Sequence, residues 1–374
     1  MKKLLIDAIS TSSGGAVTHL NVILRNFENQ NFFSHVNVHL PYKTMLQMPK
    51  NKKIHYTYNR IFERYLILRI IWQVLYLNAY IRFKKFNCIF VTGSSHFLIA
   101  SNVVTISQNL LPFTQTEVDR YFFSLFYVKL LLLKFTQKIS FKLSKGVIFL
   151  HEYSKKKILK HLPNFNSHSA IIAHSVHLNS KKIKYQNFKK FRIIYVSNID
   201  FYKNQIFIID AINDLFSLKP KLKEKIIVEF YGNFYPKALQ QMKYKIDSLK
   251  NGNQNFKYFG LVKKDKIYKN KKGYNTISVF ASSCENFSVS LIESLAVGLP
   301  ILCVNLQPMK SVLGRAGFFY NHNSKKSFQR QLLNIMLNRK LIKKKVLTSK
   351  SHIKKYLSED IAFKTYKFLY KMSI

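Results

Sequence analysis

Short apolar runs alternate with helix-length segments along most of this chain, and this alternation limits the possible folds more than any other feature. The first half contains five predicted strands: Leu4–Ala8, Val36–Leu40, Cys88–Thr92, Val103–Ser107 and Val147–Leu150. Four predicted helices lie between or after them: Ala16–Phe27, Arg60–Phe83, Glu117–Leu143 and Glu152–His161. Strands separated by helices predict a parallel sheet that helices cover on both faces.

The same alternation restarts after a basic, polar stretch at Asn179–Lys190, which has no apolar periodicity. The predicted strands of the second half are Arg192–Val196, Ile226–Tyr231, Lys257–Phe259, Thr276–Phe280 and Ile301–Val304. The predicted helices are Asn204–Phe216, Pro236–Lys250, Ser288–Ala296 and Ser327–Asn338. We therefore predict two Rossmann-like α/β/α domains, at residues 1–178 and 191–355, that face each other across a cleft. Residues 179–190 are the predicted linker, and a C-terminal helix at 356–374 is expected to pack back on the first domain.

The chain carries a large positive charge, with 61 Lys and Arg residues against 17 Asp and Glu and a net charge of +44. Such a charge favours a partner of opposite sign: a nucleic acid, an anionic lipid surface or a phosphorylated substrate. Two aromatic and basic stretches, Ile61–Lys85 and Tyr121–Phe135, could lie in a membrane interface or could be ordinary core-facing helices. Together with the charge, they favour peripheral contact with an anionic membrane.

The cysteine count and the N-terminal residues indicate a reducing compartment. The chain has three cysteines, an odd and sparse number that argues against a disulfide framework. Asp7 interrupts the first apolar run, so we interpret that run as a buried strand and not as a signal peptide. Neither aromatic stretch reaches the roughly 20 apolar residues that a spanning helix needs. We expect a cytoplasmic protein on the inner face of the cytoplasmic membrane.

Two glutamates mark the strongest chemical motif. A predicted strand leads into a small polar loop with Glu285, and a helix that begins near Ser288 carries Glu293 eight positions later. The first amides of a helix have no intrahelical acceptor and form an anion site. A carboxylate beside that site suits hydrogen bonds from sugar or ribose hydroxyls. By spacing alone, Glu285 could equally be a helix cap and Glu293 a surface residue.

This stretch, with the segment Pro308–Phe319 that follows it, resembles the retaining glycosyltransferases of family 4. That family has the two-domain GT-B fold and a Glu-x7-Glu motif, which Glu285 and Glu293 match position for position. Glycines after two strands, Gly232 and Gly260, and the small-Gly-Leu-Pro ending of the helix also match in order. The resemblance covers about Arg192–Asn323 well and the first half more loosely.

The resemblance implies the role of each residue in the donor site. Glu293 would accept hydrogen bonds from the ribose of a nucleotide sugar, and Glu285 would approach the donor sugar as a catalytic residue. Backbone amides between them would contact sugar and phosphate. The residues assigned to donor binding with Glu293 are Asn198, Asn204, Gly232, Asn286, Phe287, Ser288, Val289 and Ser290.

The loop after the first strand of the second half carries a further part of the family pattern. Lys203-Asn204 matches a pair whose lysine neutralises the donor diphosphate, and Lys203 is our second catalytic residue. The family's usual Gly-Arg is replaced here by Ser197-Asn198, so one of two expected phosphate cations is missing. We considered Arg192, Arg315 or another lysine as its substitute. The loss of this cation also allows an inactive relative that acts as a scaffold.

The first half contributes two loops to the resemblance. Gly14 and Gly15 open a helix after the first strand, where the family's loop faces diphosphate and acceptor. Gln108 stands where many relatives have a histidine that contacts the donor sugar, and it is our third catalytic candidate. His96 could lie in the cleft or could serve only to cap a helix, and His19 is expected to be a packing residue.

The resemblance implies transfer of a sugar from a nucleotide-diphosphate sugar to an acceptor hydroxyl with retention of configuration. No Asp-x-Asp motif and no zinc spacing occur, so we expect no metal and no cofactor besides this co-substrate. We expect a glycan or lipid-linked acceptor in surface polysaccharide synthesis, and no nucleic acid partner. The alternatives are a basic nucleic-acid-binding protein without enzymatic activity and a nucleotide-sugar epimerase of the same fold.

Overall fold

The computed structural model describes residues 2–12, 14–58, 60, 66–176, 188–249, 253–269 and 271–374. The chain divides into two compact units, the first formed by Met1–Ser175 with Tyr356–Ile374 and the second by Val176–Lys355. The predicted linker at 179–190 lies mostly outside the described residues, which resume at Phe188.

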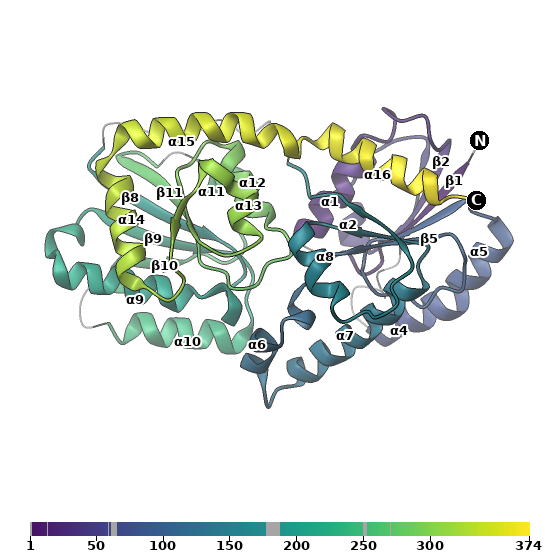
Figure 1. The fold of residues 1–374 in the computed structure, drawn as a ribbon, viewed down its shortest axis with the longest axis horizontal. Coiled ribbons are helices and arrows are strands. Elements are labelled where there is room, and N and C mark those ends of the chain that lie inside the picture. Colours follow the sequence, from purple (N-terminus) through teal and green to yellow (C-terminus); the bar gives the residue numbers. More distant parts are fainter. Residues whose placement is uncertain are drawn as a thin grey trace. The chain divides into compact units, whose positions relative to one another are not determined.

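The first unit is built on a seven-stranded sheet in which every pair of neighbouring strands is parallel (Figure 1). Its strands are β1 (Lys3–Asp7), β2 (His35–Leu40), β3 (Ile54–Tyr58), β4 (Cys88–Val91), β5 (Val103–Ser107), β6 (Gly146–Phe149) and β7 (His168–Ile171). Their order is β3-β2-β1-β4-β5-β6-β7, which is the doubly wound Rossmann order with one added edge strand.

The five strands predicted in this half are confirmed as β1, β2, β4, β5 and β6, whereas the edge strands β3 and β7 were missed. The central strands β4, β5 and β6 are buried along their whole length, as strands covered on both faces must be. The edge strands carry polar residues and are only partly buried. Their short mixed sequences have no continuous apolar run.

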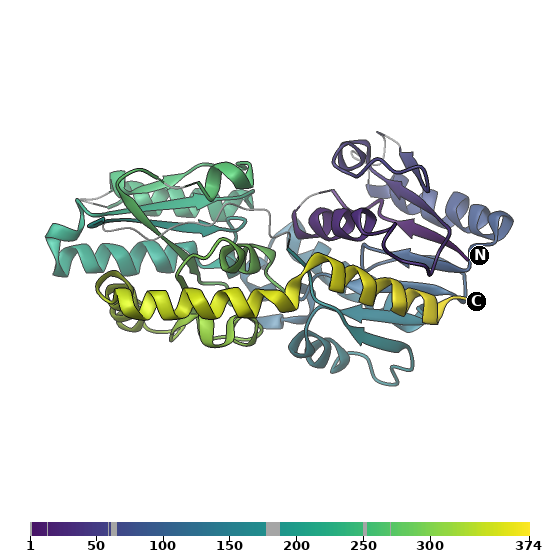
Figure 2. The ribbon, with the colours of Figure 1, turned by 90° about the horizontal axis from the view of Figure 1, so that it is seen from above.

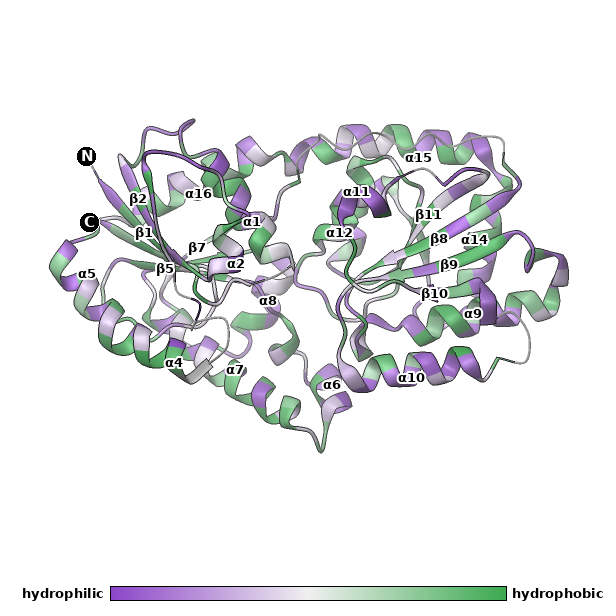
Figure 3. Cartoon of the chain, turned by 180° about the vertical axis from the view of Figure 1, so that it is seen from behind, coloured by the Kyte–Doolittle hydropathy of each residue, from purple (hydrophilic) through white to green (hydrophobic). Residues whose placement is uncertain are grey.

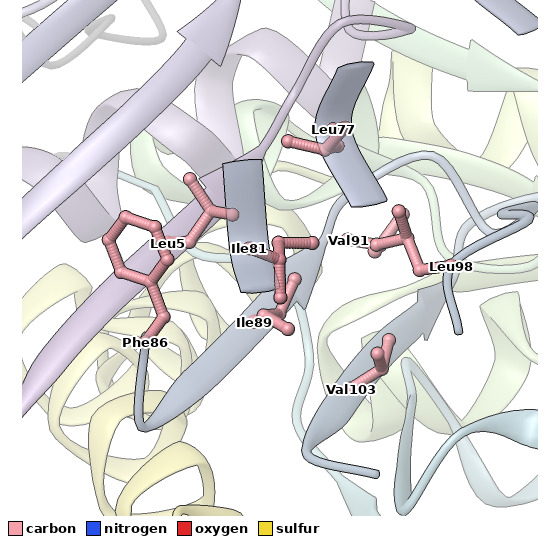
Figure 4. Packing of buried hydrophobic residues seen from close by; sticks show 8 residues of the cluster. All are labelled: Leu5, Leu77, Ile81, Phe86, Ile89, Val91, Leu98 and Val103. Atoms are coloured by element: carbon pink, nitrogen blue, oxygen red, sulfur yellow. The ribbon is translucent and has the colours of Figure 1, made fainter. Parts of the chain in front are cut away.

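Helices cover both faces of this sheet. They are α1 (Gly14–Arg25), α2 (Tyr42–Met45), α4 (Leu66–Ile71), α5 (Asn78–Lys84), α6 (Gln115–Val118), α7 (Leu125–Leu143) and α8 (Glu152–Leu159). Between α4 and α5 the chain continues as a π-helix, η1 (Trp72–Leu77). Leu77 and Ile81 of η1 and α5 pack on Leu5, Ile89 and Val103 of the sheet (Figure 4).

The single helix predicted at Glu117–Leu143 is wrong, because the chain turns out of the helix before α7. A short 3-10 helix (Asp119–Tyr121) follows α6, and Phe123 has a positive φ of 56°. Ser124 then caps α7, with its side chain accepting a hydrogen bond from the Tyr127 amide at 3.2 Å. A serine in an extended conformation before a helical run favours such a new start.

The last helix, α16 (Ser358–Met372), packs on the first unit beside α1 (Figure 2). The Tyr366 hydroxyl donates a hydrogen bond to the Ile23 carbonyl of α1 at 2.8 Å, and its ring contacts Phe27. Phe368 and Met372 of α16 would both lie about 3.0 Å from a Cβ at Gly146, so glycine in β6 lets this helix lie close to the sheet.

The second unit repeats the same winding with six parallel strands. They are β8 (Lys190–Val196), β9 (Ile226–Tyr231), β10 (Phe256–Tyr258), β11 (Tyr274–Phe280), β12 (Ile301–Val304) and β13 (Phe318–Tyr320), in the order β10-β9-β8-β11-β12-β13. All five predicted strands are confirmed, and the short edge strand β13 was missed. The Rossmann order is therefore present in both units.

The helices of the second unit are α9 (Gln205–Leu218), α10 (Pro236–Asp247), α11 (Lys264–Ile267), α12 (Val289–Ala296), α13 (Met309–Leu313), α14 (Lys325–Leu337) and α15 (Arg339–His352). The predicted helix at Ser288–Ala296 is confirmed as α12, which ends before Gly298 with a φ of 77°. Helix α15 was missed, because its basic sequence buries only Ile342 and Ser349.

Apolar side chains are exposed along several helices of the first unit. In the described part of the chain, no helix is both long enough and apolar enough to cross a membrane. Figure 3 nevertheless shows hydrophobic residues along α5 and α7. Phe123 and Leu125, at the start of α7, are each 91% exposed, and Phe83 at the end of α5 is 82% exposed.

Candidate functional site

The strand order of the second unit reverses between β8 and β11. The loop that carries Lys203 follows β8, and the loop that carries Glu285 follows β11. In open parallel sheets, ligands bind outside the carboxyl ends of the strands at such a reversal. The buried Tyr195 joins the two loops, because its hydroxyl donates to the Lys203 carbonyl at 2.7 Å and lies 3.1 Å from the Ser282 hydroxyl. The Ser283 amide also donates to the Tyr202 carbonyl at 2.8 Å. The loops thus form one connected edge.

Lys203 and Glu285 form an ion pair at this edge. Both side chains are nearly buried, at 11% and 10% exposure. Burial by itself lowers the pKa of Lys203, but the neighbouring Glu285, Tyr195 and Asp200 outweigh this effect and raise the pKa above its ordinary value. Lys203 is therefore a fixed cation beside a carboxylate.

Asn204 positions this pair through the neighbouring loop. It has a left-handed φ of 54°, and asparagine is one of the few residues that adopt this conformation readily. Its side-chain amide donates to the Ala281 carbonyl at 2.9 Å and to the Ser283 hydroxyl at 3.2 Å. Asn198 is exposed, and its carbonyl accepts a hydrogen bond from Gln205. The Asn204 side chain thus joins the two loops, and its contact with the donor stays a prediction.

Gly232 follows β9 and lies against the loop after β8. Its φ is 141°, and a Cβ at this position would lie 2.2 Å from the Ser197 carbonyl oxygen. The Gly232 amide donates to the Gly260 carbonyl at 2.9 Å. Close backbone packing therefore accounts for glycine at this position.

The segment between the glutamates runs along the start of α12. Asn286, Phe287 and Ser288 are buried, and Val289 and Ser290 are partly exposed. The Ser288 and Ser290 hydroxyls lie 3.2 Å apart. Ser288 is the N-cap residue but makes no side-chain capping bond to an amide of the helix. This end of α12 thus presents the backbone donors that an anion would use.

Glu293 lies one to two turns into α12 and is only 7% exposed. It forms an ion pair with Lys264 of α11. Burial raises the pKa of Glu293, whereas Lys264 and a hydrogen bond with Tyr268 lower it in part. No sequence pattern pointed to these two partners, because Lys264 lies on a four-residue helix outside the motif and Tyr268 follows directly after that helix.

Arg192 does not replace the missing phosphate cation. Its guanidinium is buried, and its Nε donates to the Glu229 carboxylate at 2.5 Å. It also donates to the Tyr231 hydroxyl at 2.9 Å and to the Ile267 carbonyl at 2.9 Å. The suggestion made from the sequence is wrong, because this buried side chain is paired with Glu229 and hydrogen-bonded within the second unit.

The first unit brings together its own predicted residues at the same type of sheet edge. Gly14 begins α1 with a φ of 68°, and open space surrounds the position of its absent Cβ. Gly15 follows within the helix. Gln108 follows β5, and its side-chain amide donates to the Thr92 carbonyl at 2.9 Å. The Thr11 and Thr92 hydroxyls lie 2.7 Å apart and join the loops after β1 and β4.

The two histidines considered in this unit are buried. The His96 ring lies 2.8 Å from the Ser144 hydroxyl, and burial lowers its pKa to about 4. His19 packs edge-on against His174 with 4.7 Å between ring centroids, and burial lowers its pKa to about 4 as well. His19 is therefore a packing residue, as predicted. Within the described ranges, no group of three His, Cys, Asp or Glu residues could hold a metal ion.

A comparison with protein families decides what kind of domain carries the two glutamates. Residues 179–351 match the family model described as glycosyl transferases group 1, and this range covers nearly all of the second unit. The second unit is similar to the glycosyl transferases of group 1 over this range. The chain is accordingly an enzyme of the glycosyltransferase class. No curated protein sequence matches the chain significantly.

Solved structures show the same fold over almost the whole chain. The sucrose-phosphate synthase from Thermosynechococcus elongatus has a TM-score of 0.76 at 11% identity, with 98% of each chain covered. WaaG, a glycosyltransferase involved in lipopolysaccharide biosynthesis, has a TM-score of 0.73 at 12% identity, with 98% of this chain and 99% of WaaG covered. Anabaena HepE, solved with UDP and glucose, has a TM-score of 0.69 at 13% identity, with 99% of each chain covered. The predicted GT-B fold is confirmed.

Proposed function

We propose that this glycosyltransferase moves a sugar from a nucleotide-diphosphate sugar to an acceptor hydroxyl and retains the anomeric configuration. The observation that carries the proposal is the Lys203–Glu285 pair, held beside the start of α12 at the reversal of the second sheet. A cation, a carboxylate and the amides at the start of a helix together match the phosphates and hydroxyls of such a donor. HepE, which was solved in complex with UDP and glucose, has the same fold and supports this donor class.

In the proposed donor site, each of these protein groups contacts a different part of the nucleotide sugar. Lys203 and the first amides of α12 would contact the diphosphate, and their fixed charge would stabilise it as it leaves. Glu285 would accept hydrogen bonds from the sugar hydroxyls, and Glu293 from the ribose hydroxyls. Asn204 and Tyr195 hold the loops that carry Lys203 and Glu285. We propose that no metal is required, because these groups can meet the charge of the diphosphate.

The resemblance to family 4 supports attack from the face that the leaving group occupies. The acceptor oxygen forms a bond to the anomeric carbon while the bond from that carbon to the phosphate oxygen breaks. The acceptor proton passes to the departing phosphate, which becomes free as the nucleoside diphosphate. Gln108 of the first unit would hold sugar hydroxyls, since its amide oxygen can accept hydrogen bonds and its amide nitrogen already donates to Thr92.

We propose that the acceptor is a lipid-linked glycan of surface polysaccharide synthesis. We also propose that the enzyme acts while bound to the surface of an anionic membrane. The α7 apolar face, which we define as Phe122, Phe123, Leu125, Leu132 and Phe135, is at least 57% exposed at every residue. Lys129 and Lys142 of α7 are exposed as well. Apolar side chains flanked by lysines match a surface of acyl chains and anionic headgroups.

Ligand-induced thermal shifts test the donor assignment. We expect one of UDP, GDP, CMP or ADP, or one of their common sugars, to raise the melting temperature without added metal, since a ligand that binds only the folded state stabilises it. The shift should be lost in Glu293→Ala and in Lys203→Ala and kept in Lys266→Ala, a matched change of an exposed lysine. No shift with any ligand, together with salt-sensitive binding of RNA or DNA, would overturn the proposal.

A further inference from the structure

Both described side-chain partners of Glu293 come from the segment Lys264–Tyr268 and not from its own motif. Lys264 forms the ion pair, and the side chain of Tyr268 is hydrogen-bonded to Glu293. Glu293 is buried, whereas the Lys264 side chain is 53% exposed. The carboxylate therefore lies at the inner end of an ion pair whose cation reaches it from the surface.

The backbone that carries Lys264 is anchored to the sheet. Arg192 of β8 donates to the carbonyl of Ile267, the last residue of α11, at 2.9 Å. Ile267 and Tyr268 are both buried in a cluster with Ile194, Val297 and Leu299. Lys264 thus extends from a fixed helix, and its position relative to Glu293 does not depend on a free loop.

We propose that Lys264 is a positioning residue that holds the Glu293 carboxylate in place as the acceptor for the ribose hydroxyls of the nucleotide. This inference rests on the proposed function, which assigns Glu293 to the ribose. A carboxylate has about four acceptor positions on its two oxygens. Lys264 and Tyr268 use two of them, and two remain for the two neighbouring hydroxyls of a ribose.

The pair also has an electrostatic consequence. Burial raises the pKa of Glu293, and Lys264 opposes that rise. The other titratable group facing Glu293 is Tyr268, whose own pKa burial holds well above its ordinary value, so it stays neutral. Removal of Lys264 must therefore raise the pKa of Glu293 further. Since a protonated carboxyl accepts hydrogen bonds poorly, nucleotide affinity should then be lost at a higher pH than in the wild type.

Calorimetric titration tests the inference with whichever of UDP, GDP, CMP or ADP gives the largest thermal shift, at several pH values between 5 and 8. We expect Lys264→Met to weaken binding about tenfold at pH 7, the loss that follows when a hydrogen-bonded charge loses its partner. Its acid loss of affinity should begin at a higher pH. Lys264→Arg should keep the wild-type pH profile. Lys266→Met, on the same short helix, makes the same change of charge and should bind as the wild type does.

The outcomes separate the inference from the proposed function. If Glu293→Gln binds weakly but Lys264→Met matches the wild type at every pH, the role of Lys264 is overturned and the donor site stands. If Lys264→Arg shows the same shift of pH profile as Lys264→Met, the positive charge is not the cause and the inference also fails. If folded Glu293→Gln binds as the wild type does, the proposed ribose site itself is wrong.

Discussion

The two units share one strand order but present opposite chemistry at the reversal of their sheets. The second unit presents ion pairs there, Lys203 with Glu285 and Lys264 with Glu293. At the corresponding edge of the first unit lie the paired hydroxyls of Thr11 and Thr92 and the amide of Gln108, and the one carboxyl described there, that of Asp7, is buried with its pKa raised to about 6 by burial. The winding therefore fixes where a ligand can bind, and the side chains of each edge decide which ligand. Charges suit a nucleoside diphosphate, and neutral donors and acceptors suit sugar hydroxyls.

The largest expected effect follows from removing the cation of the second unit. Lys203→Met should lower kcat/KM for sugar transfer about a thousandfold, because a fixed charge on the leaving diphosphate acts in a water-poor site. Gln108→Ala in the first unit should lower it only about tenfold, the effect of one neutral hydrogen bond. Initial rates with the identified donor measure both. Equal losses in the two variants would contradict the contrast between the edges.

A second difference between the units appears in acid. Burial lowers the pKa of His19, His39 and His96 to about 4 and that of His174 in the same direction, all in the first unit. Between about pH 6.5 and 4 the unfolded first unit binds more protons at these sites than the folded unit does, so its stability falls as the pH falls.

Asp7 acts against this trend, because its raised pKa of about 6 makes its protonation favour the folded state below that pH. Four histidines outweigh one carboxyl. Of the described histidines of the second unit, His322 is exposed and His352 is only partly buried, so that burial lowers the pKa of His352 alone. Hydrogen exchange at pH 7, 6 and 5 should therefore show the first unit losing protection before the second. His39→Phe, which keeps a ring against Trp72 and Tyr80, should reduce the effect. Earlier opening of the second unit would contradict the prediction.

Two glycines with positive φ, one in each unit, allow the effect of the same substitution on the stability of the two units to be compared. Gly232→Ala should destabilise the second unit by about 3 kcal/mol, since the new Cβ would meet a backbone carbonyl at 2.2 Å in addition to the strained φ. Gly14→Ala should cost the first unit about 1 kcal/mol, because only the φ is unfavourable there. Denaturant unfolding followed by hydrogen exchange measures each unit. Similar losses in the two variants would show that the contact at Gly232 relaxes.

The smallest expected effect concerns the exposed apolar side chains. Phe123→Ser with Leu125→Ser should weaken binding to vesicles of mixed neutral and anionic lipid about tenfold without changing the melting temperature, because both side chains are already in solvent. Leu337→Ser, an 82% exposed leucine of the second unit, is the matched control and should bind as the wild type does. Unchanged sedimentation of the double variant with the vesicles would remove α7 from the membrane proposal.

Sequence patterns identified the parts of this fold that depend on continuous burial. The central strands of both sheets are mostly apolar and mostly buried, and their alternation with helices was enough to predict two Rossmann-like units. The edge strands β3 and β7 were missed because strands at an edge need no continuous apolar run, and β13 was missed because it has only three residues. Helix α15 was missed for a related reason, since little of its surface is buried.

By itself, the sequence determined that Lys203, Glu285 and Glu293 come shortly after strands of the second sheet. Because parallel strands bring their carboxyl ends together, it thereby placed these residues at one edge of the sheet. Only the tertiary structure decided the partner of each charge. Lys264 and Glu293 are 29 positions apart, and Arg192 and Glu229 are 37 apart. With 61 basic residues in the chain, no local pattern distinguishes the one that meets a buried carboxylate. That choice depends on how α11 packs on the sheet, and so on long-range contacts that spacing does not encode.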